Sequence, residues 1–249
     1  NKTKNNNINE NPPQEAIDQL VHLYNQRQFS VVIEKAKALL EQYPETFILW
    51  KILGLSASQM GMLGTAISAY KKCLSINPNY ADAYNNIGNA LSDQGNLDEA
   101  IDSYNKCISL KPDYAEAYYN KGNTLHDQKK FIEAVDAYRK CISLKPDYAL
   151  AHNNLGNALN DLNKLNEAID SYKKCISLQP DYAIAYFNLA NNSKKQGQYN
   201  KAIEAFNNAI DLNPNFAEAY KNMGSCLKEQ DKIDEAITAY SKALSIKPD

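Results

Sequence analysis

The sequence has little net charge, few histidines and no long apolar run, and these shortages exclude several classes of function. Its 27 Lys and Arg nearly balance 29 Asp and Glu, which leaves a net charge of −2. We therefore expect no nucleic-acid partner and no attraction to acidic lipid. No stretch of 18 apolar residues occurs, so the sequence predicts no membrane span. Without an anchor or a signal-peptide pattern, we expect a cytoplasmic chain.

The chain begins with the polar stretch NKTKNNNINENPP, which holds too few apolar side chains to pack into a core. We therefore expect residues 1–12 to form a disordered tail. The sequence starts with Asn rather than Met, and it stops at IKPD, where a further helix would begin. We interpret it as a piece of a longer protein.

Signatures of catalysis are also missing. The histidines His22, His126 and His152 have no partner at metal-ligand spacing. No nucleophile elbow, phosphate-binding loop or dinucleotide fingerprint occurs in the sequence. The sequence therefore predicts no catalytic residue, no metal site and no cofactor, and we expect that this chain is not an enzyme.

Five cysteines are present, but the spacing of four of them opposes disulfide formation. Four cysteines follow one another at intervals of 34 residues, and alanines continue the series: Cys73, Cys107, Cys141, Cys175, Ala209 and Ala243. A position that accepts Cys or Ala needs a small apolar side chain. Equivalent positions of stacked units lie about 10 Å apart, whereas a disulfide joins Cα atoms within ~7 Å. We expect free thiols in a core.

The whole chain follows the same 34-residue period. With Ala81 as position 1, position 8 is Gly in five of six units, position 20 is always Ala, position 24 is always aromatic and position 32 is always Pro. Positions 4, 7, 8 and 11 share one helical face, and positions 20, 24 and 27 share another, so each unit predicts two amphipathic helices. Proline then ends the second helix. Because one helix pair cannot bury both of its faces, the units must stack.

This pattern resembles the tetratricopeptide repeat family, since its W/Y–L–G–L/Y–A–F/Y–A–P motif recurs six times without an insertion. The resemblance implies an all-α solenoid of stacked antiparallel helix pairs that forms a right-handed superhelix. The predicted array spans 13–249, with repeats at 47–80, 81–114, 115–148, 149–182, 183–216 and 217–249. A degenerate copy is expected at 13–46, where Ala16 and Leu20 replace the aromatic residue and the glycine. A poorly matching terminal unit is typical of a capping repeat.

Position 6 is asparagine in five consecutive repeats, namely Asn86, Asn120, Asn154, Asn188 and Asn222. At 100° per residue this position points about 200° away from position 4. We therefore expect these side chains to lie opposite the packed face, without any contact that stabilises the fold. Position 9 adds a second row, formed by Asn89, Asn123, Asn157 and Asn191. In the family that this chain resembles, the first helix of each unit lines a concave groove, so the resemblance places both rows there.

A column of primary amides suits the backbone of an extended peptide, because each amide can pair with both an N–H and a C=O. The column resembles the asparagine ladder in the tetratricopeptide arm of O-GlcNAc transferases, which holds substrate peptides. Position 13 adds the carboxylates Asp93, Asp127 and Asp161, so the predicted ligand is a neutral to basic peptide or protein segment. The alternative explanation is that duplication copied the asparagines without any function.

These observations predict a non-catalytic scaffold for protein–protein interaction that binds an extended segment along its groove. Two other readings remain open at this point. The chain could be the substrate-recruiting arm of a larger enzyme, with an O-GlcNAc-type glycosyltransferase as the example that the ladder suggests. It could also be a structural module that self-associates weakly, end to end, through its last repeat, because we expect the outer face of that repeat to be uncovered.

Overall fold

The structure is a computed structural model that describes residues 11–248, so residues 1–10 of the expected disordered tail lie outside the described part. Within this range the chain is all-α, as predicted, and contains no strand. Its fourteen helices are α1 (Gln14–Asn25), α2 (Phe29–Gln42), α3 (Phe47–Gln59), α4 (Leu63–Ile76), α5 (Ala81–Asp93), α6 (Leu97–Leu110), α7 (Ala115–Asp127), α8 (Phe131–Leu144), α9 (Ala149–Asp161), α10 (Leu165–Leu178), α11 (Ala183–Lys195), α12 (Tyr199–Leu212), α13 (Ala217–Lys228) and α14 (Ile233–Ile246). None of them is long and apolar enough to cross a membrane.

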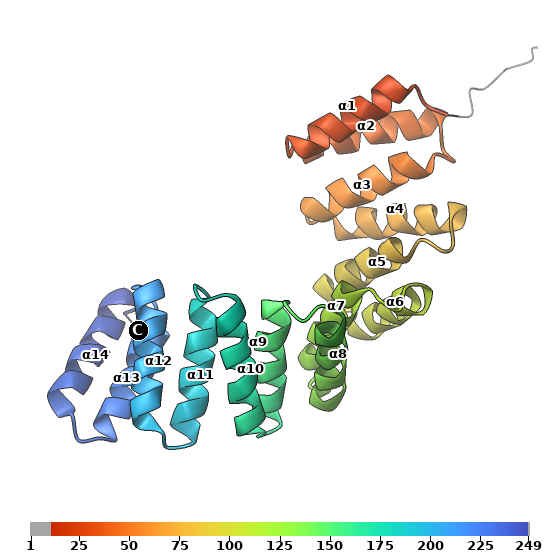
Figure 1. The fold of residues 1–249 in the computed structure, drawn as a ribbon. Helices are drawn as coiled ribbons and strands as arrows, with labels where there is room; N and C mark the ends of the chain where they lie inside the picture. The colour runs from red at the N-terminus through yellow and green to blue at the C-terminus, as the bar shows by residue number, and fades with distance from the viewer. Residues whose placement is uncertain (1–10, 249) are drawn as a thin grey trace, which may run out of the picture. The chain divides into compact units, whose positions relative to one another are not determined.

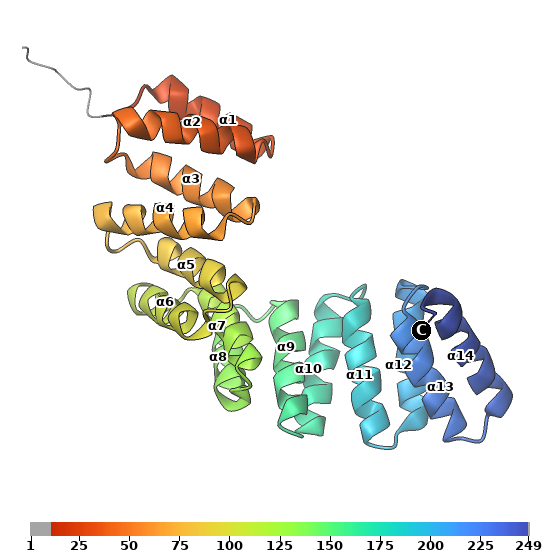
Figure 2. The same cartoon turned by 180° about the vertical axis from the view of Figure 1, so that it is seen from behind.

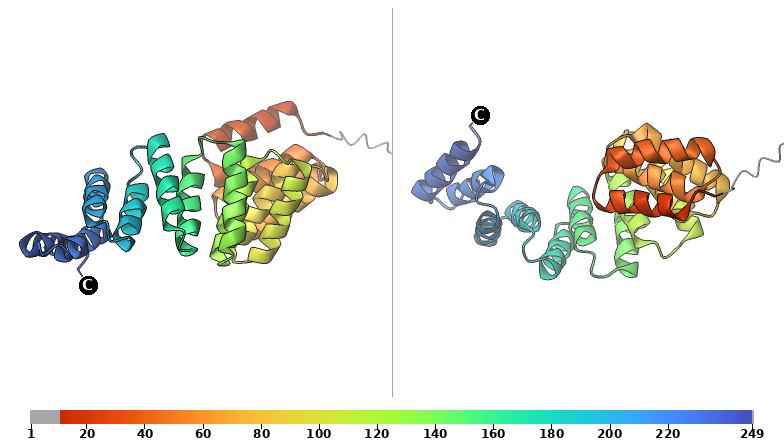
Figure 3. Two further views of the ribbon diagram at one scale, coloured as in Figure 1. Left: turned by 60° about the horizontal axis from the view of Figure 1, so that its bottom comes forward. Right: turned by 90° about the horizontal axis from the view of Figure 1, so that it is seen from above.

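The chain divides into two compact units, unit 1 (1–120) and unit 2 (121–249), and the boundary falls within α7. In each unit, successive helices run antiparallel as pairs, and neighbouring pairs pack side by side (Figures 1 and 2). Figure 3 shows this stacking for α9 to α14 of unit 2 from two further directions. One pair of helices lies within each 34-residue repeat, and inside each unit the second helix of a repeat contacts the first helix of the next, as α4 contacts α5 and α10 contacts α11.

The two helices of a repeat approach each other most closely at the glycine of position 8. A Cβ atom on Gly156 would lie 2.5 Å from Cε1 of Tyr172, the aromatic residue of position 24, and this tyrosine is only 2% exposed. The ring therefore occupies the space that a larger residue at position 8 would need. In the repeat at 183–216 this glycine is replaced by Ala190, and the ring is that of Phe206.

The cysteines are free and buried, as expected from their spacing. Burial raises the pKa of Cys73, Cys141 and Cys175 to about 11. The pKa of Cys107 rises further, to about 12, because the nearby carboxylate of Asp82 adds to the effect of burial. The four thiols of position 27 therefore stay protonated at neutral pH and serve as small apolar side chains.

Replacing the glycine of position 8 tests how tightly each helix pair is packed. We expect Gly156→Ala to lower the free energy of unfolding by about 1–3 kcal/mol, because the new methyl group collides with the ring of Tyr172. The matched control is Gly64→Ala in α4, where a Cβ atom meets nothing within 4 Å. This control gains about 0.5–1 kcal/mol from helix propensity alone. Urea unfolding followed by circular dichroism measures both, and a stabilised Gly156→Ala protein would contradict the packing described here.

Two deeply buried asparagines differ in whether their amides are hydrogen bonded. Asn153 is 3% exposed; its Oδ1 accepts from Nδ2 of Asn188 at 3.1 Å, and its Nδ2 donates to Oδ1 of Asn154 at 3.1 Å. Asn192 is 1% exposed, and neither Oδ1 nor Nδ2 has a partner among residues 11–248. A buried amide without partners lowers stability, since folding removes its hydrogen bonds to water without replacement.

We expect Asn192→Ala to raise the free energy of unfolding by about 1–3 kcal/mol, because alanine removes the uncompensated amide. Alanine is already present at the same position of other repeats, as Ala90 and Ala158. The comparison variant Asn153→Ala should instead lower the free energy of unfolding by about 1–2 kcal/mol, since Asn188 and Asn154 each lose a hydrogen bond. Thermal melts of the two proteins should shift in opposite directions. A shift in the same direction would mean that Asn192 is hydrogen bonded in solution.

Candidate peptide-binding surface

The asparagines of positions 6 and 9 bind each other across the junctions between repeats. In unit 2, Nδ2 of position 6 donates to Oδ1 of position 9 in the preceding repeat. These bonds run from Asn154 to Asn123 at 2.9 Å, from Asn188 to Asn157 at 3.1 Å and from Asn222 to Asn191 at 3.0 Å. The expectation that the position-6 amides make no contact that stabilises the fold is therefore wrong. The first helices of neighbouring repeats contact each other, so a second side of each helix is also packed.

The tyrosine of position 24 completes this network from within its own repeat. The hydroxyl of Tyr172 donates to Oδ1 of Asn157 at 2.9 Å, so this oxygen accepts hydrogen bonds from both Tyr172 and Asn188. Burial raises the pKa of Tyr172 above its usual value, which keeps the hydroxyl protonated as a donor. Tyr138 donates to Asn123 at 2.8 Å in the same way.

Unit 1 contains related bonds. Tyr104 donates to Asn89 at 2.8 Å, and Nδ2 of Asn120 donates to Oδ1 of Asn85 at 3.2 Å. In the repeat at 47–80 the residue of position 9 is Leu55, so the hydroxyl of Tyr70 lies instead 3.3 Å from Ser58 Oγ. Burial raises the pKa of Tyr70 to about 12, and the nearby amide of Asn86, the first asparagine of the predicted ladder, lowers it only slightly.

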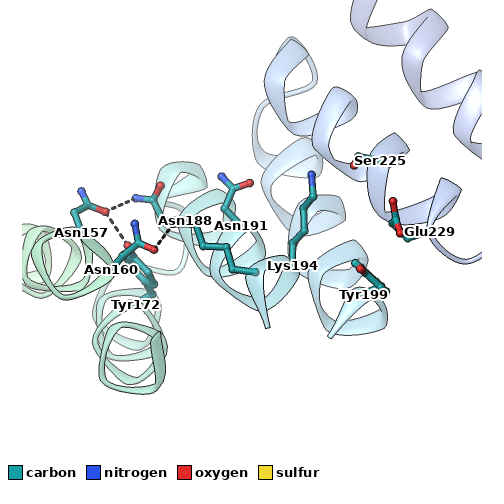
Figure 4. A pocket seen from close by; sticks show the side chains of 10 residues that line it. Asn157, Asn160, Tyr172, Asn188, Asn191, Lys194, Tyr199, Ser225 and Glu229 are labelled. Carbon is teal, nitrogen blue, oxygen red and sulfur yellow. Dashed lines mark hydrogen bonds between the residues drawn. The ribbon is translucent and has the colours of Figure 1, made fainter. Parts of the chain in front are cut away.

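Two recesses open over these amides in unit 2. The α11 recess has a volume of about 570 Å³, and its lining consists of Asn157, Asn160, Tyr172, Asn188, Asn191, Lys194, Lys195, Tyr199, Ser225 and Glu229 (Figure 4). The α9 recess, of about 200 Å³, is lined by Asn123, His126, Asp127, Tyr138, Asn154 and Asn157. Both recesses include Asn157, so they are neighbours along the same surface.

The internal bonds decide which atoms of the amides remain for a ligand. Nδ2 of Asn188 and Oδ1 of Asn157 are bonded to each other, whereas Oδ1 of Asn188 and Nδ2 of Asn157 have no partner within residues 11–248. Figure 4 shows these two atoms on the same side of the bond that joins the residues. The surface therefore presents an acceptor from position 6 next to a donor from position 9.

The predicted carboxylates lie at exposed sites. Asp127 lines the α9 recess, and Oδ2 of Asp161 lies 2.8 Å from Nε2 of His126. Asp93 belongs to α5 of unit 1, so it does not join this pair. Asn160 and Lys194 were not among the predicted surface residues, although position 12 supplies both of them together with His126 and could have indicated a third row.

Of the predicted amides, the structure brings together Asn123, Asn154, Asn157, Asn188 and Asn191 over the two recesses. Asn86, Asn89 and Asn120 belong to unit 1. Within the described residues, no group of three or more His, Cys, Asp and Glu side chains could hold a metal ion.

Comparison with family models covers most of this repeat array. Models described as TPR repeat match residues 88–129, 156–191 and 194–231, and models described as Tetratricopeptide repeat match 49–80, 69–102, 115–148, 137–170 and 217–249. The chain belongs to the tetratricopeptide repeat family. Repeats of this family are typically non-catalytic interaction modules. A comparison with curated protein sequences found no match.

Solved structures share this tetratricopeptide architecture. MamA is 30% identical, with a TM-score of 0.63 over 65% of this chain and 94% of that one. YrrB, described as a TPR protein with an unusual peptide-binding site, is 26% identical, with a TM-score of 0.65 over 74% of this chain and 95% of that one. The C-terminal part of a TPR repeat-containing protein from Cytophaga hutchinsonii has a TM-score of 0.77 over 93% of this chain and 95% of that one; at 15% identity it supports the fold alone.

The tetratricopeptide network predicts unequal effects on stability for two aspartate substitutions. Asn157→Asp keeps the oxygen that accepts from Tyr172 and Asn188, so we expect its free energy of unfolding to change by less than about 0.5 kcal/mol. Asn188→Asp loses the donor to both Asn153 and Asn157 and should cost about 1–3 kcal/mol. Urea unfolding at pH 7 compares the two proteins. Equal losses would show that the bonds do not have the direction described here.

Proposed function

We propose that the tetratricopeptide surface of unit 2 binds an extended peptide segment of a partner protein through the peptide backbone. The observation that carries this proposal is the alternation of unused amide atoms, an acceptor at Asn188 beside a donor at Asn157, over the α11 recess. An extended strand offers N–H and C=O groups in alternation, which is the complement of this surface. The internal bonds hold the amides in place, so binding orders few side chains.

The length of the bound segment follows from the spacing of the repeats. The amide rows of unit 2 run from Asn123 to Asn222 and cross three junctions between repeats. At roughly 10 Å per repeat these junctions span about 30 Å. An extended chain advances about 3.3 Å per residue, so the segment covers about nine residues. Asp127 at the α9 recess favours a neutral or basic residue over that end.

The structure changes how the amides should be tested. Replacing Asn120, Asn154 and Asn188 with alanine removes bonds between repeats, so weaker binding by such a protein would be confounded by lower stability. The double variant Asn157→Asp, Asn191→Asp keeps the internal acceptors and removes only the donors toward the ligand. It therefore separates peptide binding from repeat stacking.

We expect this double variant to bind uncharged, acetylated and amidated nine-residue peptides about 5- to 100-fold more weakly than the wild-type protein, because two donors are lost. A peptide array identifies binding pools, and fluorescence anisotropy measures their affinities. The control is Asn200→Asp, Asn208→Asp, which adds the same charge at exposed sites on α12, outside both recesses. Equal binding by wild-type protein and both variants, at equal stability, would overturn the proposal and leave the asparagines as parts of the fold alone.

A further inference from the structure

The repeat at 183–216 reverses the charge of the peptide-binding surface. At position 13 the repeats from 81 onward carry a carboxylate, with the exception of Lys195: Asp93, Asp127, Asp161 and Glu229. Position 12 of the same helix adds Lys194, where the two preceding repeats have His126 and Asn160. Two adjacent ammonium groups thus enter the surface at α11.

Both lysines line the α11 recess, and their contacts differ. Nζ of Lys195 donates to Oδ1 of Asn160 at 2.8 Å, which anchors this ammonium group at the junction with the preceding repeat. Lys194 is half-buried, and in the part of the chain that the structure describes it has no hydrogen bond or ion pair. Figure 4 shows the side chains of Lys194 and Asn191 extending from α11 on the same side of the helix. Glu229 lines the same recess without forming an ion pair with either lysine within residues 11–248.

We propose that the α11 recess receives an anionic side chain of the bound segment, and this inference rests on the proposed function. The ammonium group of Lys194 has no ion pair within residues 11–248, so an anion that enters the recess gains a charge-assisted hydrogen bond from it. Nδ2 of Asn191, which lines the same recess, adds a neutral donor, because Oδ1 of this residue already accepts from Asn222. A basic side chain in the same place would meet two like charges, which disfavours it.

The neighbouring α9 recess has the opposite preference. Asp127 lines it, and Asp161 lies next to it through the contact with His126 at 2.8 Å. The α9 recess lies over the junction between the repeats at 115–148 and 149–182, and the α11 recess begins at the next junction, where Lys195 contacts Asn160. Successive junctions are about 10 Å apart, which corresponds to about three residues of an extended peptide. The surface of unit 2 therefore selects a segment with a basic residue about three positions from an acidic one. This order of charges also sets the direction in which the segment lies.

The anion could be a carboxylate of Asp or Glu or the phosphate of a phosphorylated side chain, since both accept hydrogen bonds from an ammonium group. The test uses five pools of acetylated nine-residue peptides with Arg fixed at one position and the residue three positions away fixed as Glu, phosphoserine, Ser or Lys. Four pools are amidated, and the fifth has Ser at that position and a free C-terminal carboxylate. Anisotropy is measured for wild type and for Lys194→Gln, Lys195→Gln.

We expect wild-type protein to bind the Glu pool, the phosphoserine pool or both about tenfold more tightly than the Ser pool, and the stronger of the two identifies the source of the anion. The double variant should lose this preference. The control is Lys173→Gln, Lys201→Gln, which removes the same amount of charge from α10 and α12, outside both recesses. This control should retain the preference for the anionic pool. Lys195→Asp restores the charge found in the other repeats and should shift the preference toward the Lys pool.

Several results would overturn the inference. If wild-type protein binds all five pools equally, the recess has no anionic preference, while peptide binding itself stands. If only the pool with the free C-terminus binds more tightly, the recess holds a chain terminus and not a side chain. If no pool binds, the proposed function fails as well. Thermal melts of every variant confirm that the compared proteins are equally folded, and a preference that survives in Lys194→Gln, Lys195→Gln would exclude these lysines.

Discussion

The tyrosine of position 24 connects the packing inside a repeat to the bonds between repeats. Its ring fills the space above the glycine of position 8, which brings the two helices of the pair together. Its hydroxyl donates to the amide of position 9, and that amide accepts again from position 6 of the next repeat. The same residue thus sets the distance between paired helices and holds the acceptor on which the junction depends. The recesses and the unused donors and acceptors all follow from this arrangement.

The repeat at 183–216 shows what happens when this residue changes. Phe206 has no hydroxyl, so among residues 11–248 Oδ1 of Asn191 accepts only from Asn222. Ala190 replaces the glycine that the other repeats place against the ring, and Asn192 buries an amide that has no partner in the described part of the chain. The same repeat carries the two lysines of the α11 recess. Its departures from the common pattern therefore concentrate where the candidate surface has its largest recess.

Much of the fold could be predicted from the sequence, because the same packing residues recur in each 34-residue repeat. The glycine, alanine, aromatic residue and proline at positions 8, 20, 24 and 32 indicate two helices and their close approach without any structure. The helical wheel failed at position 6, because it assumed one packed face per helix. In a stacked array a first helix meets its own partner, the preceding pair and the next first helix, so only a narrow strip remains exposed.

The candidate site was harder to predict for the same reason. Position 5 varies among Lys51, Asn85 and Phe187, so no pattern at this position marks it as buried, yet Asn85 is 2% exposed and accepts a hydrogen bond from Asn120. The direction of the hydrogen bonds between the asparagine amides depends on side-chain geometry, which the sequence alone does not give. Lys195 was visible as the one basic residue of its row, but the sequence does not show that it shares a recess with Lys194.

The amide bond between repeats has a consequence for how such a chain can grow. Its donor at position 6 and its acceptor at position 9 are both encoded in each of the units at 81–114, 115–148, 149–182 and 183–216. A copy of such a unit therefore brings one half of each bond to both of its new boundaries. Adding a whole repeat thus keeps the donor and acceptor paired, whereas inserting a single residue into α11 before Asn188 would rotate the donor by about 100° relative to the rest of that helix. A tandem duplication of such a unit therefore lengthens the chain and preserves the amide hydrogen bond at each junction between the copied repeats.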